Sequence, residues 1–303
     1  MRTEYRLGTV AFGTGPATPV AVAEGRLYPL SEVAKHGQFA DAPTSVRAFF
    51  ERGLHNSETW DTALAACKSA TQGWGLDEVT IGTPIADPRK IVLVGVNYRD
   101  HIEEMKVAEL PKFPYAFLRP PTSLAAHGET IRLPDGAKLI DWEAELGVVI
   151  GTRIAAGSTV DDQSLLAAVG GYTVINDVSA RDWIATRPPV GIDWVMQKAW
   201  DRFQPTGPWV TPAKFVADPQ SLTIELTVNG VVKQHSNTSN MVFSVAQILR
   251  HLATIMTLEP GDIIATGTPA GVGFGRKPIE TIKAGDVVSV SIGALGTLTN
   301  TFA

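Results

Sequence analysis

The stretch AKLIDWEAELGVVIG, from Ala137 to Gly151, places three acidic residues at alternate positions just before a long apolar run. This pattern predicts a β-strand, and because side chains alternate across a strand, Asp141, Glu143 and Glu145 should share one face. Carboxylates crowded on one face raise one another's pKa values, and a bound cation removes that cost. Ligands that are all oxygen suit Mg²⁺, Mn²⁺ or Ca²⁺ rather than zinc. The alternative is a polar strand face turned to water, but the run from Leu146 to Ile150 indicates that the strand enters a core and favours a metal site.

Composition narrows the class of protein. The 303 residues are enough for two domains, and 44% hydrophobic with 19% charged residues is typical of a globular protein. The net charge of −5 does not suggest an electrostatic footprint for nucleic acid or for an anionic membrane, so neither partner is expected. Cys67 is the single cysteine, so no internal disulfide forms, and we expect it to pack in a core. The sequence opens on no signal-peptide pattern, and no apolar run reaches the roughly 18 residues of a membrane span, so we expect a cytoplasmic protein.

The first 85 residues predict a small N-terminal α+β domain. Short apolar runs alternate with Gly and Pro turns over about the first 30 residues, which is typical of a small antiparallel sheet. Two helices are predicted next, Val46–Arg52 with Ser45 as its cap, and Glu58–Ala70. A stretch rich in Gly, Pro and Asp follows, and we place a domain boundary there, near residue 85.

Residues 86–303 predict a β-rich second domain with few helices. The stretch IVLVGVNY, residues 91–98, has the pattern of a buried strand, and an Asn229-Gly230 turn indicates a hairpin. One helix, Ser244–Thr254, interrupts the late strands. The fold class expected for the whole chain is therefore α+β and β-rich.

Two further places in the sequence carry side chains that could bind a metal ion or act as a general base. Asp177 ends the apolar run from Tyr172, so its carboxylate can complete a metal site with Glu143 and Glu145; the alternative is a helix N-cap. His101 and Glu104 lie three apart on a predicted helix, so the carboxylate can orient the imidazole as a general base. The alternative for this pair is an ordinary surface ion pair.

Lys198 and a Gly-rich loop are candidates for binding an anion. Lys198 stands among aromatic residues, where its amine can bind a developing oxyanion or a carboxylate. The alternative is a surface lysine whose aliphatic chain packs on the protein while its amine stays in water. The loop ATGTPAGVGFG, residues 265–275, offers backbone N–H groups and the Thr268 hydroxyl. It lacks the Lys-Ser/Thr of a P-loop, so nucleotide binding is not expected, and a plain tight turn is the alternative.

Six motifs follow one another in the second segment: GVNYRDH, RPPTSL, DWEAELGVVIG, NDVSARDW, QKAWDRFQPTGPW and GDIIATGTPAGVG. In this order they resemble the fumarylacetoacetate hydrolase family over about residues 90 to 303. The resemblance implies a C-terminal domain folded as a mixed β-sandwich roll, a variable N-terminal domain, and a homodimer.

The resemblance also assigns roles within the chain. It implies that Mg²⁺ or Mn²⁺, with Ca²⁺ as a further option, is held by Glu143, Glu145 and Asp177, while Asp141 is not a ligand. It implies that His101 and Glu104 form the catalytic dyad, in a segment that often closes over the substrate as a lid. Lys198 is the implied catalytic lysine, and Thr268 the residue that holds the substrate carboxylate. Arg119 and Gly267 complete the substrate-binding residues that we expect.

A 2-oxo acid is the substrate class that the resemblance implies. The leading prediction is a metal-dependent hydrolase that cleaves a C–C bond of a 2,4-dioxo acid of the acylpyruvate or fumarylpyruvate type, through an enolate stabilised by the ion. The alternative is an isomerase or decarboxylase of dicarboxylic 2-oxo or 2-hydroxy-dienoic acids in aromatic catabolism, and an outside alternative is a non-catalytic 2-oxo-acid-binding protein. Two departures bear on the substrate: Arg119 stands where relatives frequently carry Lys, and Ile184 where many carry Gln.

Overall fold

The computed structural model describes residues 4–106, 109–184 and 191–303, which fold mainly as β-strands joined by short helices. The strands are β1 (Arg6–Phe12), β2 (Ala17–Ala23), β3 (Arg26–Pro29), β4 (Val79–Ile81), β5 (Ile91–Gly95), β6 (Tyr115–Arg119), β7 (Leu124–Ala125), β8 (Thr130–Ile131), β9 (Ile140–Asp141), β10 (Ala144–Ile150), β11 (Val169–Asn176), β12 (Ser179–Ala180), β13 (Gln204–Pro212), β14 (Thr223–Val228), β15 (Val231–Asn237), β16 (Ile263–Ala265), β17 (Val287–Ile292) and β18 (Gly296–Phe302). The α-helices are α1 (Leu30–His36), α2 (Val46–Glu51), α3 (Glu58–Ala70), α4 (Arg99–Glu104), α5 (Asp162–Ala167), α6 (Trp194–Lys198) and α7 (Val245–Ile255).

Two sheets organise the molecule. The larger has the strand order β3-β2-β1-β13-β11-β10-β16-β5-β6, with β4 beside β1 and β7 beside β13, and the smaller has the order β15-β14-β17-β18-β8. Most neighbours are antiparallel, but β16 runs parallel to β5. The two sheets face each other across one apolar core, in which Leu146 of β10 meets the same cluster as Val290 of β17 and Phe302 of β18. The predicted β-rich α+β fold is confirmed.

The central strand β10 is buried on both faces. Its Leu146, Val148 and Ile150 belong to the core between the sheets, whereas Val149 belongs to a second core beneath the N-terminal helices. Trp60 and Leu64 of α3 pack in that second core. Burial on both faces explains why the sequence after Glu145 is continuously apolar rather than alternating.

Local signals in the sequence set several element ends. The Ser45 hydroxyl accepts a hydrogen bond from Ala48 N at the start of α2, and Ser57 caps α3 in the same way, so both predicted N-terminal helices are confirmed. Asn229 and Gly230 both have positive φ, 51° and 78°, in the turn between β14 and β15. This is the hairpin turn that the dipeptide predicts.

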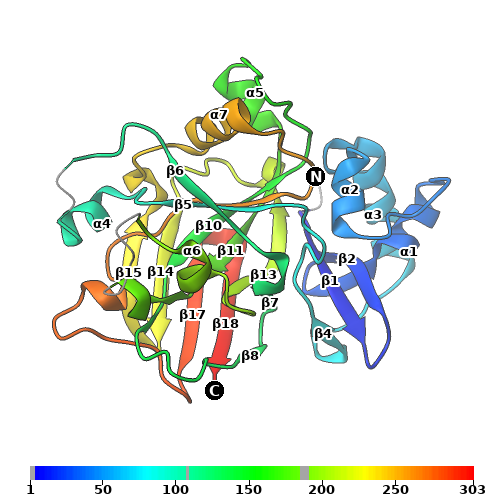
Figure 1. The fold of residues 1–303 in the computed structure, drawn as a ribbon. Coiled ribbons are helices and arrows are strands. Elements are labelled where there is room, and N and C mark those ends of the chain that lie inside the picture. The colour runs from blue at the N-terminus through cyan, green and yellow to red at the C-terminus, as the bar shows by residue number, and fades with distance from the viewer. Residues whose placement is uncertain (1–3, 107–108, 185–190) are drawn as a thin grey trace.

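The N-terminal segment is joined to the rest by a strand pair as well as by the second core. Figure 1 shows β1 and β2 with α1, α2 and α3 gathered at one end of the molecule, away from α4. β1 pairs with β13, where Leu7 lies opposite Val210, so the larger sheet continues from one segment into the other. A division into two domains at residue 85 stays a prediction. The described residues contain no helix that is long and apolar enough to cross a bilayer.

Candidate active site and metal centre

Three buried carboxylates meet where β10 begins and β11 ends. These strands are antiparallel, with Glu145 opposite Ile175, so Glu143 before β10 and Asp177 after β11 come together. The backbone holds them there, because Asp177 N donates to Glu143 O at 2.8 Å. Ligand atoms of Glu143, Glu145 and Asp177 all lie within 4.8 Å of one another. The predicted alternative for Asp177, a helix N-cap, is not what the structure shows.

Asp141 lies apart from this cluster, and the single strand expected over 137–151 is interrupted. β9 ends at Asp141 and β10 begins at Ala144, so the alternation across one face does not hold through Trp142 and Glu143. The Asp141 carboxylate instead accepts hydrogen bonds from Gly273 N at 2.6 Å and Phe274 N at 3.2 Å. Asp141 therefore anchors the Gly-rich loop, which agrees with the expectation that it is not a metal ligand.

Basic side chains balance most of the buried negative charge. Lys198 Nζ lies 2.9 Å from Glu143 Oε2 and 2.5 Å from Asp177 Oδ2. Arg181 bridges Glu143 and Asp141. Burial favours the neutral acid, but Lys198 and Arg181 outweigh it and lower the pKa of Glu143 to about 2.

Glu145 is the carboxyl whose charge is least balanced. Burial, followed by the neighbouring charges of Asp177 and Glu143, raises its pKa well above the usual value. A divalent cation removes this cost, and three buried carboxylates supply the hard oxygen ligands that Mg²⁺, Mn²⁺ and Ca²⁺ prefer. The donor set therefore fits a hard divalent ion.

The predicted dyad is formed on α4, beside the acidic cluster. His101 Nδ1 lies 3.1 Å from Glu104 Oε2, and both side chains are mostly buried rather than on an open surface. Glu104 Oε1 also accepts from Gly271 N at 2.9 Å, which fastens α4 to the Gly-rich loop. Burial alone would raise the pKa of Glu104, but the hydrogen bonds from His101 and Gly271 hold it below the usual value.

Lys198 ends α6 and is only 3% exposed, so it is not the surface lysine of the alternative interpretation. Thr268 is buried and lines the same cavity as Lys198 and His101. Gly267 N donates to Glu145 Oε2 at 2.8 Å, so this N–H holds a carboxylate of the cluster. Gly267 has φ +96°, and a Cβ there would lie 2.8 Å from Asn97 Cβ, which explains the glycine.

Arg119 lies behind Asp177. Its guanidinium donates to Asp177 Oδ1 at 2.6 Å, to Val178 O at 2.8 Å and to Lys198 O. It also donates to Phe203 O and to Gln204 Oε1, both at 2.9 Å. Since these bonds enclose the guanidinium, its contacts favour a role in holding Asp177, and the substrate contact expected from the sequence stays a prediction.

The cavity that these residues line is small, at about 90 Å³. One wall is a stacked pair, Phe117 and Trp194, whose ring centroids lie 3.9 Å apart with planes at 7°. Trp194 Nε1 donates to the Tyr115 hydroxyl at 3.0 Å, which fixes the indole. The wall limits what a ligand can carry beyond the acidic cluster.

Some residues of the site were not singled out from the sequence. Arg181 lies in the quoted motif NDVSARDW, so an arginine beside an acidic cluster was a usable signal. Phe117 and Trp194 come from β6 and α6, far apart in the chain, and no local pattern pairs them. Gln234, which contacts Thr268, comes from the other sheet.

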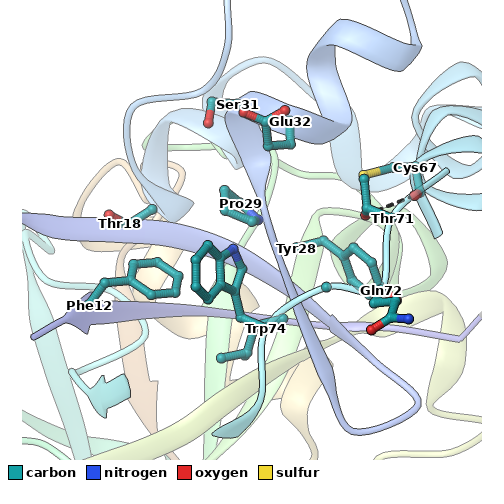
Figure 2. A pocket seen from close by; sticks show the side chains of 12 residues that line it. Phe12, Thr18, Tyr28, Pro29, Ser31, Glu32, Cys67, Thr71, Gln72 and Trp74 are labelled. Carbon is teal, nitrogen blue, oxygen red and sulfur yellow. Dashed lines mark hydrogen bonds between the residues drawn. The ribbon is translucent and has the colours of Figure 1, made fainter. Parts of the chain in front are cut away.

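A larger cavity, of about 570 Å³, lies in the N-terminal segment (Figure 2). Phe12, Trp74 and Tyr28 lie along it, with Ser31 and Glu32 on the opposite side. Among the described residues that line it, Glu32 is the single carboxylate and there is no histidine or lysine. The smaller cavity is lined by His101, Lys198 and the three clustered carboxylates, and it is therefore the candidate active site.

Residues 90–303 match the family model described as fumarylacetoacetate (FAA) hydrolase, C-terminal. The chain belongs to the fumarylacetoacetate hydrolase family. The predicted family is thus confirmed, and with it an enzyme family that acts on small molecules.

Relatives in this family carry names for different reactions. The chain is 38% identical over 258 residues to the mitochondrial oxaloacetate tautomerase of Xenopus laevis, covering 85% of this chain and 78% of that protein. The fumarylacetoacetate hydrolase structure from Exiguobacterium antarcticum is 32% identical with a TM-score of 0.77, covering 98% of this chain and 99% of that one. The 2-hydroxyhepta-2,4-diene-1,7-dioate isomerase structure from Mycobacterium marinum is 31% identical with a TM-score of 0.71, covering 99% and 98%.

These names leave the finer predictions open. Because a relative is named as mitochondrial, the cytoplasmic location stays a prediction, as does the homodimer.

Proposed function

We propose that this protein is a divalent-metal-dependent enzyme that interconverts the enol and keto forms of a small dicarboxylic 2-oxo acid of the oxaloacetate type. The observation that carries the proposal is the size of the cavity beside the acidic cluster, about 90 Å³. This is well below the usual range of ligand pockets, so it favours a short substrate. The name of the Xenopus laevis relative supports the same substrate class.

The buried charges support a cation together with an anionic ligand. Four carboxylates meet three basic side chains: Asp141, Glu143, Glu145 and Asp177 against Arg119, Arg181 and Lys198. With all seven groups ionised, including Asp141 outside the three-carboxylate cluster, they carry one net negative charge, which a divalent ion would convert to one positive charge. A 2-oxo carboxylate then neutralises the site. When bound, the ion supplies positive charge to the carboxylate and 2-oxo oxygens of the ligand.

His101 is the residue that we assign to proton transfer at C3. Its Nδ1 is engaged by Glu104 Oε2, so the other ring nitrogen is left as the base. The hydrogen bonds from His101 and Gly271 hold the pKa of Glu104 below its usual value, so the carboxylate stays ionised and can orient the imidazole. In the enol-to-keto direction the enol oxygen loses a proton to solvent and C3 receives one from His101. Lys198 balances the charge that develops on oxygen.

C–C bond hydrolysis of a 2,4-dioxo acid, the leading prediction from the sequence, is the second candidate. The specific observation in its favour is the His101–Glu104 pair itself, because the same base can draw a proton from water. The name of the Exiguobacterium antarcticum structure supports it as well. The two candidates differ in whether a carbon–carbon bond breaks.

The test mixes the protein and Mg²⁺ or Mn²⁺ with freshly dissolved enol-oxaloacetate and, separately, with acetylpyruvate. We expect the enol absorbance of oxaloacetate to fall at least tenfold faster than in buffer, with no pyruvate formed. Pyruvate from oxaloacetate would indicate a decarboxylase instead. Pyruvate and acetate from acetylpyruvate, without faster enol loss, would indicate the hydrolase. No turnover of either substrate with metal bound would support a non-catalytic binding protein.

A further inference from the structure

Gln234 is a buried amide that joins the smaller sheet to the candidate active site. It lies on β15 and is 1% exposed. Its Oε1 accepts from Ala144 N at 2.9 Å, and Ala144 stands between Glu143 and Glu145. Its Nε2 donates to Thr268 Oγ1 at 2.9 Å and to Pro269 O at 2.8 Å. One side chain thus connects the metal-binding strand to the predicted carboxylate-binding threonine.

The orientation of this amide is fixed by its partners. A backbone N–H can only donate, so the atom of Gln234 facing Ala144 N is the oxygen. A backbone carbonyl can only accept, so the atom facing Pro269 O is the nitrogen. The flipped amide would place two acceptors against each other and two donors against each other. Both amide hydrogens are therefore used, one of them on Thr268.

This orientation decides what the Thr268 hydroxyl does. Because Oγ1 receives a hydrogen from Gln234, its own hydrogen is left for another acceptor. Among the described residues no acceptor for that hydrogen is recorded, and Thr268 lines the cavity that holds Glu143, Asp177 and Lys198. The hydroxyl is thereby prepared to donate to a ligand, and an anionic oxygen is the acceptor that such a donor favours.

The backbone allows this close approach at one glycine. Gly271 has φ +101°, and a Cβ there would lie 2.1 Å from Lys233 O and 3.1 Å from Gln234 Cα. The Gly-rich loop therefore packs directly against β15 only without a side chain at this position. That contact places Thr268 and Pro269 within reach of the Gln234 amide.

We propose that Gln234 is a positioning residue for the reaction: it commits the Thr268 hydroxyl to donating to the carboxylate of the 2-oxo acid, at a fixed place relative to Glu143 and Glu145. This inference rests on the proposed function, a site for a 2-oxo acid, and on the role that the family resemblance implies for Thr268, namely holding the substrate carboxylate. Gln234 itself does not line the cavity, so it acts through Thr268.

A double-mutant cycle on oxalate binding tests the proposal. Gln234→Met removes both donors and keeps the length of the side chain, and Thr268→Val removes the hydroxyl. With Mg²⁺ present, calorimetry should show oxalate binding about tenfold weaker for each single variant. The Gln234→Met, Thr268→Val double variant should be within about twofold of Thr268→Val alone, because Gln234 has no hydroxyl left to orient. KM for the substrate should rise by a similar factor while kcat changes less.

Three controls separate this role from structural damage and from failure of the proposed function. Mn²⁺ affinity should stay within about threefold in Gln234→Met, and Thr268→Ser, which keeps the hydroxyl, should bind oxalate almost normally. Gln234→Glu has the same shape but offers a carboxylate that accepts the Thr268 hydrogen, so it too should weaken oxalate binding. Effects of Gln234→Met and Thr268→Val that simply add would overturn the role of Gln234. Normal oxalate binding in Thr268→Val would instead refute the contact between Thr268 and the substrate carboxylate that the resemblance implies.

Discussion

Replacing Arg119 by lysine should destabilise this protein although the charge is kept. The guanidinium makes five recorded hydrogen bonds, all of them buried. An ammonium has three N–H donors, so at least two buried acceptors lose their partners. At about 1–3 kcal/mol for each of two unpaired groups, we expect the free energy of unfolding to fall by about 2–6 kcal/mol. That is a large part of the stability of a typical domain.

Urea unfolding monitored by intrinsic fluorescence measures this loss, and Arg132→Lys is the matched control. The Arg132 side chain is 84% exposed, so its replacement should change the free energy of unfolding by less than about 0.5 kcal/mol. Because Arg119 holds Asp177, Arg119→Lys should also weaken Mn²⁺ binding by about tenfold. Equal stability and equal Mn²⁺ affinity in the two variants would refute the holding role that we assign to Arg119.

Three further predictions follow from the site and from one buried histidine. His101→Ala and Glu104→Ala should each lower kcat at least about 100-fold and leave Mn²⁺ affinity within about threefold; near-normal turnover in either would remove it from the dyad. Glu143→Ala should weaken Mn²⁺ binding at least about tenfold by calorimetry, and an unchanged titration would exclude it as a ligand. Burial, and next the charge of Lys214, lowers the pKa of His55 from 6.5 to about 4. Between pH 6.5 and pH 4 the imidazole is therefore protonated in the unfolded state but neutral in the folded state. The unfolding free energy should therefore fall by about 2 kcal/mol from pH 7 to pH 5, and an equally steep fall in His55→Gln would contradict this.

The sequence predicted most where the signal is local. Ser45 and Ser57 cap helices through their own nearest turn, and the Asn229-Gly230 turn needs only its two residues. Asp177 was a usable candidate because a carboxylate that follows a buried strand lies at a sheet edge. Because β10 and β11 are antiparallel neighbours, the start of β10 lies beside the end of β11, and this brings Glu143 close to Asp177.

The sequence predicted least where distant segments decide the contact. The break between Asp141 and Ala144 reflects the Gly-rich loop, whose N–H groups draw the Asp141 carboxylate away, and nothing within 137–151 indicates it. The environment of Arg119 is built by backbone carbonyls from three other parts of the chain. The pairing of Gln234 with Thr268 requires knowing that two sheets face each other, which strand periodicity alone does not give.

The proposed reaction requires Glu143, Glu145 and Asp177 to hold one divalent cation together. Anomalous diffraction from crystals soaked in Mn²⁺ tests it most directly. We expect a single strong peak within about 2.0–2.4 Å of an oxygen from each of the three carboxylates, with Lys198 moved aside from Glu143 and Asp177. Crystals that show no anomalous peak there, with Lys198 still bridging Glu143 and Asp177 at saturating Mn²⁺, would contradict the account.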